Sequence, residues 1–207
     1  MSGKLFIFGV GYSGLEIARE TLARGWLVAG TTRSADKAEK LRAQGIEPHL
    51  FDGGLLSNEL AAALRETTHL VVSIAPGGAD PVLRVARETI LSKMPKLRWI
   101  GYLSTVGVYG DHGGAWVDEE TECRPVSKRS VERLNAERQW QALGEEKSVP
   151  VAVLRLAGIY GPGRNAFANL ANGTARRIVK PGQVFNRIHV ADIAATTVHL
   201  AEGNIGG

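Results

Sequence analysis

The stretch from Lys4 to Gly14 limits what this chain can fold into more than any other part of it. It starts as an almost unbroken apolar run and continues into the glycine pattern Gly9-x-Gly11-x-x-Gly14. An apolar run without alternation predicts a strand that is covered on both faces, as in a parallel sheet. The glycines predict a tight turn, a close approach of a pyrophosphate to the backbone and close packing of the next helix. We therefore predict a dinucleotide-binding turn, and we rank it ahead of a glycine turn that binds no ligand.

Strands and helices alternate along the rest of the 207 residues. Further strands are predicted at 26–32, 46–51, 70–75, 98–104 and 149–156, the second of these breaking early at Pro48. Helices are predicted at about 15–24, 36–44, 55–66, 81–93 and 127–143, with Gly144 ending the last one. This alternation is typical of the α/β class and predicts a doubly wound parallel sheet, the Rossmann fold. We expect a dinucleotide-binding core over 1–157 and a small, reduced C-terminal substrate lobe over 158–207, integrated with that core.

Composition narrows the class of protein. No apolar run reaches the ~18 residues that suggest a membrane-spanning helix, and the N-terminal segment has no signal-peptide pattern. The single cysteine, Cys123, has no metal-ligand partner nearby in the sequence, so we expect neither an internal disulfide nor a metal site. These features favour a cytoplasmic protein without membrane contact, for which a homodimer is one candidate assembly.

The net charge of +4 says less than its distribution. Between 155 and 191 the chain has no Asp or Glu and six basic residues, which are Arg155, Arg164, Arg176, Arg177, Lys180 and Arg187. One interpretation is a solvated face. The other is a positive wall that attracts a small anionic substrate. Nucleic acid is not an expected partner, because no basic-aromatic interleaving or nucleic-acid motif accompanies these charges.

The end of the second predicted strand indicates the type of cofactor. NAD sites commonly have an Asp or Glu there, which accepts a hydrogen bond from the ribose 2′-hydroxyl. This chain has Thr32 followed by Arg33, and its next carboxylate, Asp36, falls inside the predicted helix. A hydroxyl beside a guanidinium suits a 2′-phosphate, so we predict NADP, with NAD as the alternative. The competing interpretation of Arg33 is an ordinary surface arginine.

Five segments together resemble one known superfamily. They are GVGYSG at 9–14, FDGG at 51–54, YLSTVGVYGD at 102–111, LRLAGIYGPGR at 154–164 and NRIHVAD at 186–192. In this order and over nearly the whole chain, they resemble the extended short-chain dehydrogenase/reductase superfamily, in its NAD(P)-dependent epimerase/dehydratase group. The resemblance implies a Rossmann fold, a nicotinamide cofactor and a small-molecule substrate.

The cofactor-binding candidates come from the pattern and from the resemblance. The glycine loop supplies Gly9, Gly11, Tyr12, Ser13 and Gly14, and the second strand end supplies Thr32 and Arg33. The resemblance implies that Asp52 and Gly53 meet the adenine, and that Ser73, Ile74 and Ala75 lie beneath the ribose and phosphates. It further implies that Ala157 and Gly158 line the nicotinamide, and that Arg164 and Arg187 bind the anionic part of a substrate.

The catalytic segment departs from the family pattern. The resemblance implies that Thr105 hydrogen-bonds the reacting group. The family's Tyr and Lys lie four residues apart on the helix before the sixth strand, with a Glu four further on. Anchoring on Glu137 puts Arg133 at the lysine position and Arg129 at the tyrosine position. Arginine has only donors and is not deprotonated in proteins, so Arg129 cannot exchange a proton. We expect both arginines to face the nicotinamide pocket, with Arg133 holding the ribose hydroxyls.

A second alignment of the family pattern does not supply a tyrosine either. A register that uses Lys128 as the lysine puts Arg124 at the tyrosine position. Tyr109 and Tyr160 follow strand ends, and Tyr109 is our candidate for a substitute proton donor. Two functions therefore stay open. One is an NADP-dependent oxidoreductase or epimerase/dehydratase acting on a small anionic or sugar-derived substrate. The other is a catalytically silent NADP(H)-binding protein with a redox-sensing or regulatory role.

Overall fold

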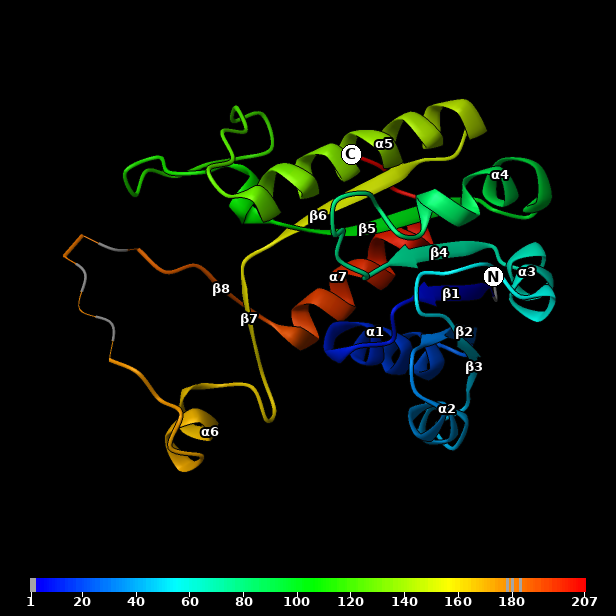
Figure 1. Ribbon diagram of the computed structural model, residues 1–207, viewed down its shortest axis with the longest axis horizontal. Coiled ribbons are helices and arrows are strands. Elements are labelled where there is room, and N and C mark those ends of the chain that lie inside the picture. The colour runs from blue at the N-terminus through cyan, green and yellow to red at the C-terminus, as the bar shows by residue number, and fades with distance from the viewer. Residues whose placement is uncertain (1–2, 178, 180, 183) are drawn as a thin grey trace.

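The computed structural model describes residues 3–177, 179, 181–182 and 184–207. Its centre is a six-stranded parallel sheet, with helices on both faces (Figure 1). The strands are β1 (Lys4–Phe8), β2 (Leu27–Thr32), β3 (Ile46–Leu50), β4 (His69–Val72), β5 (Trp99–Thr105) and β6 (Val151–Leu156). Their order, β3-β2-β1-β4-β5-β6, reverses direction at β1. The predicted doubly wound α/β fold is confirmed.

The helices cover the sheet in two groups of three. On one face lie α3 (Asn58–Arg65), α4 (Leu83–Lys93) and α5 (Lys128–Lys147), and on the other lie α1 (Tyr12–Ala23), α2 (Ala35–Arg42) and α7 (Val190–Gly203). Strand β1 supplies both layers, because Phe6 and Phe8 pack into the first and Leu5 and Ile7 into the second. This two-sided burial is the reason that the sequence of β1 is apolar without alternation.

Two predicted interruptions are wrong. Strand β3 continues through Pro48, which is tolerated because β3 lies at the edge of the sheet, where one side of the backbone needs no partner. Helix α5 continues past Gly144 to Lys147 and ends at Ser148, which has a left-handed backbone with φ 57°. Gly144 is buried, and a Cβ there would lie 2.7 Å from the carbonyl oxygen of Val149. Its role is close packing inside the helix rather than termination.

The segment after β6 leaves the sheet and then returns to it. Strand β7 (Gly158–Tyr160) pairs in parallel with β8 (Arg187–His189), and the short helix α6 (Ala166–Ala171) lies between them along the chain. Helix α7 then packs against α1, and Gly207 exchanges two backbone hydrogen bonds with β6, of 2.8 and 3.0 Å. Residues 158–207 thus include both a small two-stranded sheet and a helix of the main core. Lys180 lies outside the described residues.

Across the ranges described above, every helix is too short or too polar to cross a membrane.

His69 is a buried imidazole at the start of β4. Its ring centroid lies 4.6 Å from that of Trp26 and 6.4 Å from that of Trp99, and its Nδ1 is 2.8 Å from the hydroxyl of Thr68. Burial lowers the pKa of His69 below its usual value, because the low-polarity surroundings disfavour the charged ring. Folding therefore favours the neutral form of this histidine.

This burial predicts a stability that falls in mild acid. Because the pKa of His69 is lower when folded than when unfolded, the unfolded chain binds more protons below about pH 6.5. The free energy of unfolding should therefore be at its full value above that pH and decrease as the pH falls toward the folded-state pKa. Urea denaturation at pH 7.5 and 5.5 measures how steeply the free energy of unfolding depends on pH. His69→Gln should flatten it, whereas His199→Gln, at an exposed site on α7, should leave it unchanged. If His69→Gln shows the same pH dependence as wild type, the burial of His69 is not the cause of the acid destabilisation.

Candidate functional site

A cavity of about 920 Å³ opens at the carboxyl ends of the central strands. This is the edge at which ligands bind in open α/β sheets. Many of the residues that we predicted from the sequence form its wall, namely Gly9, Gly11, Tyr12, Ser13, Thr32, Arg33, Asp52, Gly53, Ser73, Ile74, Ala75 and Arg164. A second cavity of about 770 Å³ lies beside β3 and the outer side of α3, away from these strand ends. We therefore take the larger cavity as the candidate site.

The three glycines of the first turn have different surroundings. Gly9 has φ +89°, and a Cβ on it would lie 2.7 Å from Cγ1 of Ile74. A Cβ on Gly14 would lie 2.7 Å from the carbonyl oxygen of Gly9, so the close packing of α1 against the turn requires a glycine there. A Cβ on Gly11 would meet no atom closer than 3.9 Å. Gly9 and Gly14 are thus needed by the fold itself, whereas the space at Gly11 belongs to the cavity.

The start of α1 can hold an anion. Gly11 is its N-cap residue, and among the described residues no side-chain cap hydrogen bond is made to the first amide groups of the helix. Those amides and the helix dipole favour a negative group in front of them. Nearby, the hydroxyl of Thr31 accepts a hydrogen bond of 2.8 Å from the amide of Gly9 and so fixes the turn. A loop without side chains at Gly11, backed by free amides, fits a dinucleotide pyrophosphate.

Basic side chains line the part of the cavity next to β2. Arg33 follows β2, and Lys37 lies one helical turn later in α2, where its amide donates to the N-cap Ser34. Arg84 on α4 also lines the cavity and donates to the carbonyl oxygen of Gly53. Among the described lining residues the carboxylate is Asp52, whose Oδ1 accepts from the amide of Gly54 at 2.8 Å. The cavity wall is therefore positive at the end of β2.

Two of these cations were missed in the sequence. Lys37 could have been found, because it lies four residues after Arg33 at the start of a predicted helix. Arg84 gave no local signal, because it belongs to α4, a helix that the strand order brings to the part of the cavity beside Gly53. Asp36, the carboxylate nearest to Arg33 in the sequence, is absent from the described cavity wall.

Arg129 and Arg133, both on α5, are absent from the described cavity wall. Arg129 is exposed. Arg133 is half-buried, donates to the carbonyl oxygen of Leu103 on β5 and lies with its guanidinium carbon 5.8 Å from the ring centroid of Tyr102. The backbone of β5 and the Tyr102 ring thus supply Arg133 with partners inside the protein. The expectation that both arginines face the nicotinamide pocket stays a prediction, because Ala157 and Gly158, predicted to line the nicotinamide, are also absent from the described wall.

Thr105 ends β5 and caps a single turn of 3-10 helix, η1 (Val106–Val108), by accepting from the amide of Gly107 at 3.2 Å. A Cβ on Gly107 would lie 3.0 Å from Oγ of Ser130 and 3.4 Å from Oγ1 of Thr105. The two hydroxyls therefore flank the same glycine. Ser130 is a polar residue that we did not select from the sequence, because its neighbour Arg129 occupied the family's tyrosine position.

Glu137 anchors a buried polar network between α5, β5 and β6. Ser104 donates to its Oε1, and Arg155 donates to its Oε2 at 3.2 and 3.0 Å. Arg155 also donates to the hydroxyl of Tyr109 at 3.0 Å, with the guanidinium over that ring. Burial lowers the pKa of Arg155, but its bonds to Glu137 and Tyr109 outweigh burial and raise that pKa overall. Arg155 is thus neutralised internally and does not belong to a positive wall.

The surroundings of each tyrosine bear on whether it could donate a proton to a substrate. Tyr109 is buried, and its hydroxyl already accepts from Arg155. Burial raises the pKa of Tyr102, which makes it a poorer proton donor than a free tyrosine. Tyr160 is 43% exposed, and its ring lies 5.0 Å from that of His189. Tyr12 is the tyrosine in the described cavity wall.

The remaining predicted residues lie outside the described cavity wall. Ala157 and Gly158 connect β6 to β7, and it is the next residue, Ile159, that lines the cavity. Arg187 on β8 donates to the carbonyl oxygen of Asn186 at 2.9 Å, with its guanidinium carbon 5.2 Å from the Phe185 ring. The structure thus gathers most of the residues predicted for the cofactor's adenine, ribose and phosphates together with Arg164, and leaves Ala157, Gly158 and Arg187 outside the described wall.

Comparisons with known proteins agree with this geometry. The model of the NAD dependent epimerase/dehydratase family matches residues 5–204. Protein YeeZ of Escherichia coli strain K12 is 30% identical over 218 residues, which cover 99% of this chain and 75% of that protein. Among solved structures, a functionally unknown conserved protein from Silicibacter pomeroyi is 46% identical, with a TM-score of 0.86 over 97% of this chain and 68% of that one. UDP-glucuronic acid 4-epimerase from Bacillus cereus, solved with UDP-glucuronic acid and NAD, is 21% identical. Its TM-score of 0.75, over 96% of this chain and 73% of that one, is a likeness of fold.

Proposed function

This chain belongs to the NAD-dependent epimerase/dehydratase family, and on that premise we propose that it binds NADP(H) and acts on a small anionic or sugar-derived substrate. The proposed activity is that of an oxidoreductase or epimerase/dehydratase. The observation that carries the proposal is the cavity, in which a glycine turn with free amides lies beside a cluster of cations. A pyrophosphate suits the first of these features and a 2′-phosphate suits the second.

Each part of the cofactor has a matching part of the wall. The pyrophosphate would lie against Gly11 and the start of α1, and the adenine near Asp52 and Gly53. The 2′-phosphate would lie between Arg33 and Lys37, where the bidentate guanidinium and the ammonium can both donate to it. When bound, the nicotinamide supplies a hydride donor or acceptor. The chain's own residues supply the binding and the orientation.

On the substrate side, the hydroxyls of Thr105 and Ser130 are proposed to orient the reacting carbonyl or hydroxyl group. Both lie against Gly107 at the end of β5. Neither Arg129 nor Arg133 can accept a proton, because guanidinium groups stay charged in proteins. The substrate's own groups or water would therefore exchange the proton. General acid–base help is typically worth ~10²–10⁴-fold in rate, so we expect slow turnover.

The second candidate is a catalytically silent protein that binds NADP(H) and reports its redox state. The observation that favours it is the position of Arg133, which the backbone of β5 and the ring of Tyr102 engage away from the cavity wall. The two candidates differ in what happens to cofactor and substrate. An oxidoreductase should oxidise bound NADPH when a panel of carbonyl substrates is added, and an epimerase or dehydratase should convert its substrate with no net loss of cofactor. A sensor should leave both the cofactor and the substrates unchanged.

The cofactor preference is tested by titration with NADPH and NADH. Wild type should bind NADPH more tightly, and Arg33→Gln should weaken NADPH binding by about tenfold, the effect of one lost charge-assisted hydrogen bond. The same change should leave NADH binding almost unaffected, because NADH has no 2′-phosphate. Lys40→Gln, on an exposed part of α2 outside this cavity wall, is the matched control. Tighter binding of NADH than of NADPH by wild type would contradict the preference.

A further inference from the structure

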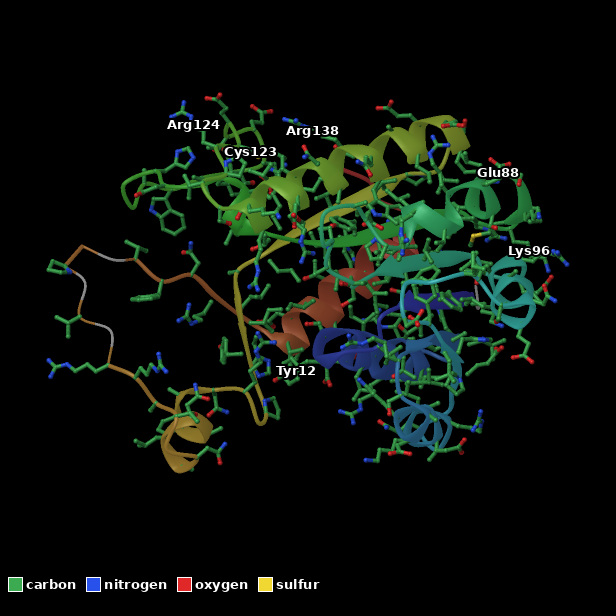
Figure 2. The ribbon with its side chains drawn as sticks, in the orientation of Figure 1. Tyr12, Glu88, Lys96, Cys123, Arg124 and Arg138 are labelled. Atoms are coloured by element: carbon green, nitrogen blue, oxygen red, sulfur yellow. The ribbon has the colours of Figure 1, made fainter. Side chains whose placement is uncertain are left out.

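The turn that follows β7 touches the phosphate-binding loop. Gly161 and Arg164 close this turn with two backbone hydrogen bonds of 3.0 Å. Tyr12, at the start of α1, donates its hydroxyl to the carbonyl oxygen of Pro162 at 3.1 Å, and Figure 2 shows it beside this turn. A Cβ on Gly161 would lie 2.6 Å from the Tyr12 hydroxyl. The phosphate loop and the segment after β6, about 150 residues apart in sequence, are thus joined through one tyrosine.

Arg164 extends this junction into the cavity. Its guanidinium carbon lies 5.5 Å from the ring centroid of Tyr12, and the side chain lines the cavity together with Gly11 and Ser13. Within the described part of the chain, no carboxylate lies within ion-pair distance of it. A guanidinium supported on an aromatic face keeps its donors in one plane, and this suits a phosphate.

We infer that Arg164 binds the pyrophosphate of the cofactor, with the ring of Tyr12 as its support. The inference rests on the proposed dinucleotide site and assigns to the cofactor an arginine that we had expected to bind substrate. It has a structural consequence. A cofactor held by both Gly11 and Arg164 would connect the core to the turn that Gly161 and Arg164 close, so cofactor binding would stabilise that turn before a substrate binds.

Ligands with and without a pyrophosphate separate this role from others. Arg164→Gln should weaken NADPH binding by about tenfold, as expected for the loss of a charge-assisted hydrogen bond. The same variant should bind adenosine 2′-monophosphate as wild type does, because that nucleotide has no pyrophosphate. Arg164→Lys should recover part of the NADPH affinity. Arg138→Gln, at an exposed position on α5 outside the described cavity wall, should change neither affinity.

Limited proteolysis gives a second measurement that does not depend on affinity. Trypsin can cut after Arg176 and Arg177, which are exposed in the segment between β7 and β8. Saturating NADPH should slow this cleavage in wild type but not in Arg164→Gln saturated with the same cofactor. Equal protection of the two proteins, or unchanged NADPH affinity in Arg164→Gln, would overturn the inference and leave the proposed function intact. A wild-type protein that binds neither NADPH nor NADH would overturn both.

Discussion

Gly11→Val is expected to abolish dinucleotide binding, weakening it by at least about 100-fold, while the protein still folds. The side chain would enter the space in which a pyrophosphate meets the backbone, and it would separate the phosphate from the amides at the start of α1. Among the described residues other than its two chain neighbours, no atom lies closer than 3.9 Å to a Cβ at this position, and φ is −86°, outside the left-handed region that favours glycine. The variant should therefore melt within a few degrees of wild type. Isothermal titration with NADPH, beside a thermal melt, measures both effects.

Gly14→Val is the matched comparison, because it changes the same turn in the opposite way. A Cβ at Gly14 would lie 2.7 Å from the carbonyl oxygen of Gly9 and 3.3 Å from the side chain of Ile7. The carbonyl oxygen of Gly9 belongs to the backbone and cannot move aside unless α1 moves as well. The main effect of Gly14→Val should therefore be a lower free energy of unfolding. If Gly11→Val binds NADPH as well as wild type does, the assignment of the glycine turn to a pyrophosphate is wrong.

Glu137→Ala is expected to cost about 3 kcal/mol of unfolding free energy, because it leaves a largely buried arginine without its counter-charge. Glu137 is 2% exposed and accepts from both Arg155 and Ser104. Losing it would leave the guanidinium with Tyr109 as its remaining side-chain partner. For a chain of this length, such a loss lowers the melting temperature by about 6–12 °C. Thermal and urea denaturation at neutral pH measure it.

Two further variants test the cause. Glu145→Ala lies on the exposed side of the same helix and should change the unfolding free energy by no more than about 0.5 kcal/mol. Adding Arg155→Leu to Glu137→Ala should recover part of the loss, because the buried charge is then gone as well. If Glu137→Ala alone costs less than about 1 kcal/mol, water reaches Arg155 and the network contributes little to stability.

Local patterns explain which parts of the site could be predicted from the sequence. The turn at Gly9, Gly11 and Gly14 depends on the spacing of residues within one strand and the next helix. Such a turn can therefore be predicted from the sequence. Arg33 follows the same logic, because it lies at the end of a recognisable strand. Arg155 shows the opposite case. Its charge looked available to a ligand, and only the packing of α5 against β5 and β6 showed that Glu137 neutralises it.

The sequence by itself determined the α/β class, the parallel strands and the position of the glycine turn between β1 and α1. These depend on hydrophobic periodicity and on glycine geometry over a few consecutive residues. Only the tertiary structure decided that Lys37, Arg84 and Arg164 share one cavity and that Arg133 is bound to the backbone of β5. The physical reason is that these side chains contact residues of elements that are far apart in the chain. Strand order and helix packing set those distances, and no local pattern encodes them.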